Sequence, residues 1–346
     1  MIRISVQYLR DPLYKNSLFI ILSTAIGSIL GFVYWMIAAR YYLAKDVGLA
    51  TALISAMNLI AIFSRLGIGI GLIRYLPEER KQAELLGSAL LIVSVVAVTI
   101  SAVYVLIVDK VSPPLNFLRE IKLFALFAAF TSATVLLGIQ RNAFIGFRRA
   151  EFAFIQNLTW MGLKAIIVVF FVSLGAIGIF ISWGISLLLA LFLSLFVLTP
   201  KVLSCYPKIG LRLGVVREMI QFSLGNYVAV VFQNSSQLIL PIIVLNVLGA
   251  ESAAYFYMAW MIAFLLFSVS EAVGSSLLAE GSYNKNHLKQ EFFKAVKFIG
   301  FILLPALFFI LFFGDWILNL FGEAYSDNAL NLLKVLSLSA IPVAFN

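Results

Sequence analysis

The sequence predicts an all-α, polytopic integral membrane protein with two helical lobes related by a parallel internal repeat. Its composition, its long apolar runs and the repetition of those runs predict this fold. Of the 346 residues, 62% are hydrophobic and 12% are charged, and the mean hydropathy is +1.04. A soluble domain carries about 25% charged residues, because it must cover its surface. Lipid is therefore expected to be the solvent around most of this chain.

Ten apolar stretches in the sequence are long enough to cross the hydrocarbon core of a bilayer, which takes about 20 residues. In chain order they cover residues 17–39, 47–73, 85–108, 123–139, 152–174, 176–198, 222–248, 252–279, 292–314 and 329–345. None alternates as the strands of a membrane β-barrel do, so the spans are predicted to be helices. The first run is too long for a cleavable signal peptide, and further spans follow it.

The distribution of basic residues predicts that the N-terminus is cytoplasmic, and the protein is expected to be a multi-pass protein of the cell (plasma) membrane. The basic residues concentrate before the first span and after the even-numbered spans. The intervening loops hold only Arg40, Lys45, Lys110, Arg119 and Lys122. Cytoplasmic loops carry an excess of Lys and Arg, and the opposite topology would reverse that excess. This orientation explains the net charge of +9 without a nucleic-acid partner.

The spans repeat along the chain. A shift of 206 residues places spans 1 to 4 on spans 7 to 10 with the same orientation, which is a parallel repeat. We predict an N-lobe over 1–200 with helices 1–6, a cytoplasmic linker over 201–218 and a C-lobe over 219–346 with helices 7–10. Spans 5 and 6 have no counterpart in the second half. Two further helices of about 60 residues are therefore expected, and a natively ten-span protein is the alternative.

A glycine-rich stretch, "SRLGIGIGLIRYLPEER" from Ser64 to Arg80, lies at the cytoplasmic end of span 2. Its G-x-G-x-G spacing in a membrane helix differs from the strand–turn–helix fingerprint of a dinucleotide site. Small residues there are expected to allow close helix packing or a bend between lobes. Arg74 lies where a basic side chain contacts phosphate headgroups and the helix stops.

Several stretches resemble a known family of transporters. They are "ARYYLAKDVGLATAL", "LIRYLPE", "VLGAESAAYFYMAW" and "FGEAYSDNALNLLKVLSLSAIP". They are similar to polysaccharide transporters, the oligosaccharide-lipid flippases of the multidrug/oligosaccharidyl-lipid/polysaccharide exporter (MOP) superfamily. The resemblance implies two six-helix lobes. It also implies a polyprenyl-(di)phosphate-linked oligosaccharide moved from the cytoplasmic to the outer leaflet for surface polysaccharide or glycan assembly.

Lys164, near Asn157 in span 5, is a candidate ligand for the cargo. A charge at the bilayer centre costs about 2.5–3.5 kcal/mol on insertion scales, so a charged residue there is expected to have a specific role. In a water-filled cleft a lysine would attract a pyrophosphate, and the low dielectric of the surroundings would strengthen this Coulomb attraction. The alternative is a hydrogen bond that only holds two helices together.

Arg65 and Glu271 occupy equivalent positions of the two repeats. They are expected to pair across a closed cleft and separate when it opens. Alternatively Glu271 binds a coupling ion, H⁺ or Na⁺, or pairs locally while Arg65 extends to the surface. The polar run in span 7, with Gln233, Asn234 and Gln237 ahead of a proline, favours a cleft facing sugar over a polar seam between helices.

Three functions remain open on the sequence. The leading one is a lipid-linked oligosaccharide flippase, with membrane lipids as surroundings and glycosyltransferases or a polymerase as potential partners. The second is a cation-coupled multidrug exporter, which the scarcity of acids in the spans disfavours. The third is a non-transporting scaffold of a polysaccharide-synthesis complex. An enzyme, a cofactor or a metal site is not expected, because the chain contains a single cysteine, Cys205, a single histidine, His287, and no plausible nucleophile–base pair.

Overall fold

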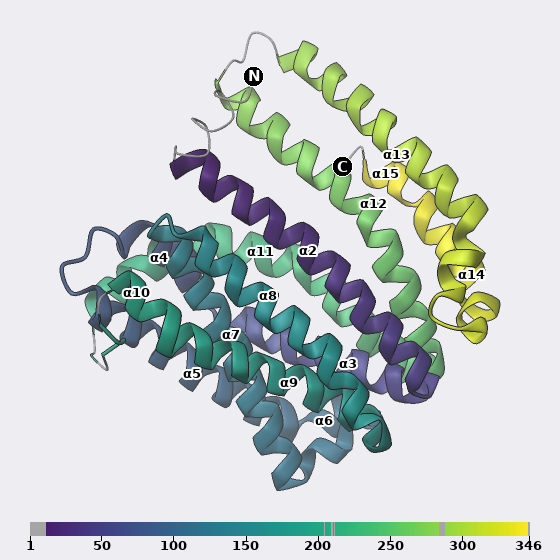
Figure 1. Ribbon diagram of the computed structural model, residues 1–346, viewed down its shortest axis with the longest axis horizontal. Coiled ribbons are helices and arrows are strands. Elements are labelled where there is room, and N and C mark those ends of the chain that lie inside the picture. Colours follow the sequence, from purple (N-terminus) through teal and green to yellow (C-terminus); the bar gives the residue numbers. More distant parts are fainter. Residues whose placement is uncertain (1–11, 204, 209, 211, 284–287, 345–346) are drawn as a thin grey trace. The chain divides into compact units, whose positions relative to one another are not determined.

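The computed structural model describes residues 12–203, 205–208, 210, 212–283 and 288–344. Those residues form helices and short connections, without any strand. They divide into two compact units, Met1–Ala250 and Glu251–Asn346, which we call the first and the second unit. The predicted all-α membrane fold is confirmed (Figure 1).

The first unit contains long helices and short helical connections. Its α-helices are α2 (Pro12–Tyr41), α3 (Ala44–Ser64), α4 (Ile68–Tyr75), α5 (Gln82–Leu106), α6 (Val108–Val111), α7 (Ile121–Gly146), α8 (Ala150–Ile167), α9 (Gly175–Leu193), α10 (Thr199–Leu203) and α11 (Leu213–Leu248). Three further helical turns lie between them, η1 (Pro113–Arg119), η2 (Val168–Leu174) and η3 (Ser194–Leu198). Helix α3 is central, since it packs against α5, α7, α9 and α11.

The second unit is a smaller group of helices. It contains α12 (Ala250–Tyr283), α13 (Leu288–Asn319), α14 (Glu323–Leu338) and α15 (Ala340–Val343). Helix α14 folds back on α13 at Gly314, where a side chain would come within 3.3 Å of Leu330 and 3.4 Å of Leu333. The missing side chain of this glycine therefore allows the two helices to pack closely.

Eight helical stretches among the described residues are long and apolar enough to cross a membrane. One of them, Ala150–Leu203, contains 54 residues and includes both predicted spans 5 and 6. The prediction of a tenth full span over 329–345 is wrong in its bounds. Helix α14 has only 16 residues and begins at Glu323, so polar residues occupy its first turns and the remaining apolar stretch is short.

The predicted span 47–73 is not one helix. Helix α3 ends at Ser64 and α4 begins at Ile68. Between them Leu66 has φ +49° and Gly67 has φ +74°, so two successive residues adopt the left-handed conformation. Such residues cannot continue a right-handed helix, and the backbone therefore turns a corner here.

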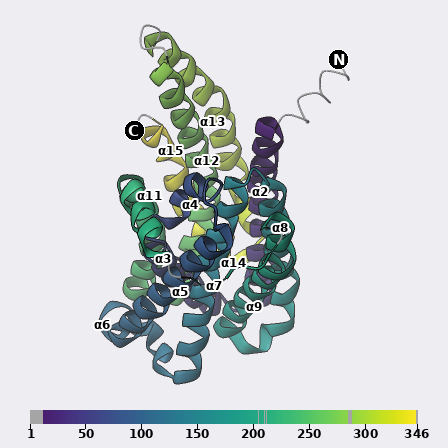
Figure 2. The same ribbon diagram turned by 90° about the vertical axis from the view of Figure 1, so that its left-hand side faces the viewer.

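The glycines after this corner allow α4 to lie between two neighbouring helices. A Cβ on Gly71 would come within 2.6 Å of the Met219 Cβ in α11, and Gly67 faces α11 as well. Gly69 faces Asn142 of α7 so closely that a side chain there would overlap it. The close-packing interpretation of this stretch is confirmed, and α11 runs beside α3 and α4 (Figure 2).

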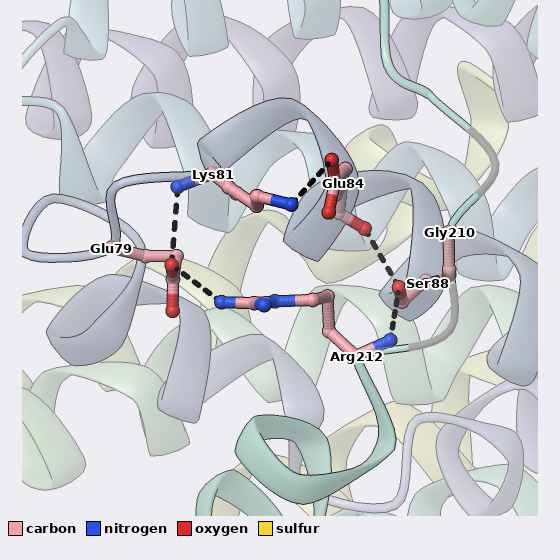
Figure 3. Close-up of polar contacts among 6 residues, drawn as sticks. All are labelled: Glu79, Lys81, Glu84, Ser88, Gly210 and Arg212. Atoms are coloured by element: carbon pink, nitrogen blue, oxygen red, sulfur yellow. Dashed lines mark hydrogen bonds and ion pairs between the residues drawn. The ribbon is translucent and has the colours of Figure 1, made fainter.

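The linker between α10 and α11 is bonded to the start of α5. The Lys208 backbone N–H donates to the Ala83 carbonyl at 3.0 Å. The Ser88 hydroxyl contacts the Gly210 carbonyl and accepts a hydrogen bond from the Arg212 backbone N–H at 3.1 Å (Figure 3). The linker is therefore fixed to the first unit directly before α11 begins.

An ionic contact reinforces the same attachment. Glu79 pairs with the Arg212 guanidinium at 2.8 Å and accepts a hydrogen bond from the Lys81 backbone N–H at 3.1 Å (Figure 3). The Lys81 hydrogen bond first, and then the charge and hydrogen bond of Arg212, outweigh burial and hold the pKa of Glu79 below its ordinary value. The carboxylate is therefore ionised at neutral pH and joins the linker to the loop before α5.

The predicted lobe boundary follows the sequence repeat rather than compactness. Helix α11 begins the second predicted lobe, yet it packs against α3, α4 and α5 and belongs to the first compact unit. Near the C-terminal end of α11, Asn246 accepts a hydrogen bond from Ser112 at 3.1 Å and donates one to the Val111 carbonyl at 2.7 Å. The division into 1–200, 201–218 and 219–346 stays a prediction.

Candidate functional site

Lys164 lies in the interior of the first unit, on α8. Its side chain is buried, with a relative exposure of 1%. The ammonium Nζ is 3.9 Å from the ring centroid of Trp183, 4.8 Å from that of Tyr34 and 4.9 Å from that of Trp160. We call these three rings the aromatic cage. A desolvated cation gains about 2 kcal/mol or more from a favourable aromatic face, so the cage partly offsets the cost of burying Lys164.

Three helices build the aromatic cage. Trp160 lies one turn before Lys164 on α8, Tyr34 comes from α2 and Trp183 from α9. The ring centroids of Trp160 and Trp183 are 5.5 Å apart, as are those of Tyr34 and Trp183, and both pairs meet edge to face. The Tyr34 hydroxyl donates to the Ile179 carbonyl at 3.1 Å, which fixes the ring against α9.

The cage is not predicted from the sequence. Its one local signal is Trp160, since residues four apart on a helix are neighbours on its surface. Tyr34 and Trp183 reach Lys164 only through tertiary packing of α2 and α9 against α8.

The polar groups around Lys164 are mainly hydrogen-bond donors. The indole nitrogens of Trp160 and Trp183 are buried and form no hydrogen bond within the described residues. An indole N–H and an ammonium donate and do not accept. The chemistry of this interior therefore favours a ligand rich in acceptor oxygens, such as a phosphate, a carboxylate or a sugar.

Asn157 lies two turns before Lys164 on α8, and it holds two helices together. Its Nδ2 donates to the Ser23 carbonyl in α2 at 3.0 Å. Gly27, also in α2, lies so near that an added Cβ would be 2.8 Å from the same nitrogen. In this arrangement Asn157 joins α2 to α8. Its predicted role toward a cargo stays a prediction.

Arg65 lies at the corner between α3 and α4, and its guanidinium packs against α7 beside Gly138. Glu271 lies in α12 of the second unit, where its side chain is exposed. Arg65 belongs to the first unit and Glu271 to the second, and their predicted pairing is a contact between the two units. The gate and the coupling-ion site therefore stay predictions.

The polar run of α11 combines exposed and partly buried side chains. Gln233 is exposed, and Asn234 and Gln237 are partly buried. The Asn234 side chain donates to the Val230 carbonyl one turn earlier at 2.8 Å. Pro241 lies inside the helix and has no N–H for the Gln237 carbonyl. Helix α11 packs against α3 and α4, whereas Lys164 lies among α2, α8 and α9, so the structure separates these predicted residues.

Arg74 lies in the last turn of α4 and is exposed. Its Cζ is 4.5 Å from the ring centroid of Phe222 in α11 and 5.6 Å from that of Tyr75. These rings position the guanidinium while leaving it accessible. Its predicted contact with lipid phosphate stays a prediction.

Acidic and basic side chains occupy different places along the helices of the first unit. The described acids of the first unit lie in connections or within the first two turns of a helix: Asp46, Glu78, Glu79, Glu84, Asp109, Glu120, Glu151 and Glu218. Lys164 lies in the last turn of α8, where η2 continues the helical stretch, and its side chain is buried. Arg141 is one turn and a half from the end of α7. Among the described residues, no group of His, Cys, Asp and Glu has the arrangement of a metal site.

The fold is that of membrane transporters of the MOP superfamily. An inward-facing multidrug resistance MATE family transporter of this superfamily superposes with a TM-score of 0.68 at 16% identity, over 92% of this chain and 79% of that one. A MOP superfamily transporter from Pyrococcus furiosus, described by a reverse polarity of its binding pocket, gives 0.63 at 16% identity, over 98% and 82%. MATE in the straight conformation gives 0.58 at 18% identity, over 98% and 82%.

The family follows from the sequence itself. A model of the polysaccharide biosynthesis protein family matches residues 20–330, and the chain belongs to that family. No curated protein sequence matches it significantly. The predicted family and the predicted multi-pass membrane architecture are confirmed, and family and fold are those of membrane transporters.

Proposed function

We propose that this protein moves a polyprenyl-(di)phosphate-linked oligosaccharide from the cytoplasmic to the outer leaflet of the cell membrane. The observation that carries the proposal is the charge of the first unit's interior. Lys164 is buried among donors, whereas the described acids lie at helix starts and in connections. A buried cation in a low-dielectric interior attracts an anionic cargo and repels a cationic one.

Membership of the polysaccharide biosynthesis family supports a saccharide cargo. For the Pyrococcus furiosus transporter, the reverse polarity of the binding pocket suggests a different function. We apply the same reasoning to this chain, whose interior charge is basic. The saccharide head group would cross along polar side chains such as Gln233 and Gln237 while the lipid tail stays in the bilayer. Glycosyltransferases or a polymerase of the same pathway would supply and consume the cargo.

The test is transbilayer movement of a fluorescent polyprenyl-diphosphate oligosaccharide in proteoliposomes. Lys164→Met removes the buried charge and keeps a long apolar side chain. Lys45→Met is the matched control, because Lys45 is an exposed cation in the first turn of α3. We expect wild type and Lys45→Met to move the cargo and Lys164→Met to be at least about tenfold slower, as for a lost charge-assisted contact.

The outcomes separate the competing functions. Equal movement by Lys164→Met and wild type contradicts a role for this charge in transport. No movement by folded wild type, with or without an H⁺ or Na⁺ gradient, contradicts the flippase and leaves the multidrug exporter or the scaffold. The fold shared with MATE transporters is the observation that favours the exporter as the second candidate.

A further inference from the structure

Arg65 is held by a strained corner of the backbone. Helix α3 ends at Ser64, and Leu66 follows with φ +49° before Gly67 with φ +74°. The left-handed conformation is disfavoured for a leucine, because its Cβ crowds the following carbonyl oxygen. Strained residues of this kind persist where the surrounding structure fixes them, and they occur often at functional sites. The corner sets the direction in which Arg65 leaves the backbone.

The Arg65 guanidinium lies against α7 where that helix has no side chain. A Cβ built on Gly138 would be 3.1 Å from the Arg65 Nη2 and 3.2 Å from its Cζ. The Arg65 Nε is buried and has no hydrogen-bond partner in the described part of the chain. A buried donor without a partner carries an uncompensated desolvation cost, which a ligand oxygen would remove.

A second guanidinium lies on the same face of α7. Arg141 follows Gly138 by three residues, which places the two on one side of the helix. The Arg65 guanidinium lies against α7 at Gly138, one turn before Arg141, so two positive charges share this part of the α7 surface. Neither arginine forms an ion pair with the described residues, and Arg141 is exposed and accessible to a ligand. Two adjacent cations without a carboxylate are stabilised by an anion between them.

We propose that Arg65 and Arg141 together bind a phosphate-class anion at the predicted cytoplasmic end of the first unit. Each guanidinium offers a planar fork of N–H donors that matches phosphate oxygens, and Arg keeps its charge when buried. Gly138 leaves the space that Arg65 occupies beside this anion. The inference rests on the proposed function for its expected source, the diphosphate of the cargo. Phospholipid headgroups would supply the same chemistry.

The first experiment measures binding of inorganic pyrophosphate to the full chain in phosphatidylcholine nanodiscs by calorimetry. We expect Arg65→Gln and Arg141→Gln each to weaken binding at least about tenfold, the loss of one charge-assisted hydrogen bond. Arg217→Gln is the matched control, since Arg217 is another exposed cation on the predicted cytoplasmic side. Absence of pyrophosphate binding by wild type, or equal weakening by Arg217→Gln, overturns the proposal.

A variant that retains every charge tests the geometry. Gly138→Ala adds a methyl group about 3 Å from the Arg65 guanidinium, so the side chain must move. We expect pyrophosphate affinity to fall several-fold while thermal stability stays close to wild type. Unchanged affinity in folded Gly138→Ala contradicts the placement of the anion beside this contact. Gly162→Ala, where an added Cβ meets nothing within 4 Å, is the control.

Competition identifies the source of the phosphate. A polyprenyl diphosphate that displaces pyrophosphate supports the cargo as ligand, whereas displacement by phosphatidylglycerol in the nanodisc assigns the site to membrane lipid. Pyrophosphate binding that depends on both arginines, without movement of the cargo, supports the anion site and contradicts the proposed function. Movement of the cargo by wild type without pyrophosphate binding overturns the anion site alone.

Discussion

Replacing Lys164 by methionine separates stability from transport. The ammonium gains about 2 kcal/mol or more from favourable aromatic faces, which the variant loses. Against this loss, a charge in the bilayer centre costs about 2.5–3.5 kcal/mol on insertion scales, which the variant is spared. The methionine sulfur also regains about 0.3–1.5 kcal/mol from each aromatic contact. These terms nearly cancel. We therefore expect the free energy of unfolding of Lys164→Met to lie within about 2 kcal/mol of that of wild type, or above it.

The assay is thermal unfolding in detergent, followed by tryptophan fluorescence, since Trp160 and Trp183 flank the substituted side chain. Lys164→Ala is the contrasting variant: it leaves a cavity among three rings, and we expect it to be less stable by about 2–4 kcal/mol. If Lys164→Met were as unstable as Lys164→Ala, the charge itself would stabilise the fold. The interpretation of Lys164 as a group that stability alone does not require would then be refuted.

Three other predictions concern the packing of the first unit. Gly71→Val is expected to destabilise the protein by about 1–3 kcal/mol, because its Cβ meets Met219 of α11 at 2.6 Å. Gly225→Val is the control and is expected to lose less stability, because an added Cβ there meets no atom within 4 Å. Equal losses of stability in the two variants, measured by thermal unfolding, would contradict close packing of α4 on α11. Ser88→Ala removes the hydroxyl that holds the linker, and we expect a loss of about 1–2 kcal/mol and faster linker proteolysis. Because the folded-state pKa of Glu79 is lowered, its stabilisation is present above its unfolded pKa and is lost as pH falls through the folded pKa. Glu79→Gln is therefore expected to lose less stability than wild type on acidification, and identical acid profiles would contradict this.

Apolar composition predicts most of the helices, because length and hydropathy decide what crosses a bilayer. The corner after α3 is not predicted, since Leu66 is an ordinary helix residue and only tertiary packing places it at φ +49°. The bounds of α14 are also not predicted from the apolar pattern. Its apolar residues continue past Leu338, but the helix ends there and a separate turn, α15, follows.

The candidate site is predicted only where a single residue is unusual in its sequence context. Lys164 stands out because it is a charge within an apolar run. The aromatic cage is not visible, because Tyr34 and Trp183 are ordinary membrane residues until α2, α8 and α9 bring them to one point. Arg141 follows the predicted span 123–139 as one of several basic residues after an even-numbered span, and the sequence does not distinguish it from the others. Its proximity to Arg65 depends on the tertiary packing that brings Arg65 beside Gly138 of α7.

The most direct test of the proposed function is whether the protein moves an anionic cargo or a cationic one. Proteoliposomes with purified full chain would receive, in parallel, a fluorescent polyprenyl-diphosphate oligosaccharide and a fluorescent lipophilic cation of the kind that drug exporters carry. We predict protein-dependent movement of the anionic cargo that falls in Lys164→Met, and no protein-dependent movement of the cation. Movement of the cation alone, driven by an H⁺ or Na⁺ gradient, would contradict the flippase and identify the protein as a drug exporter.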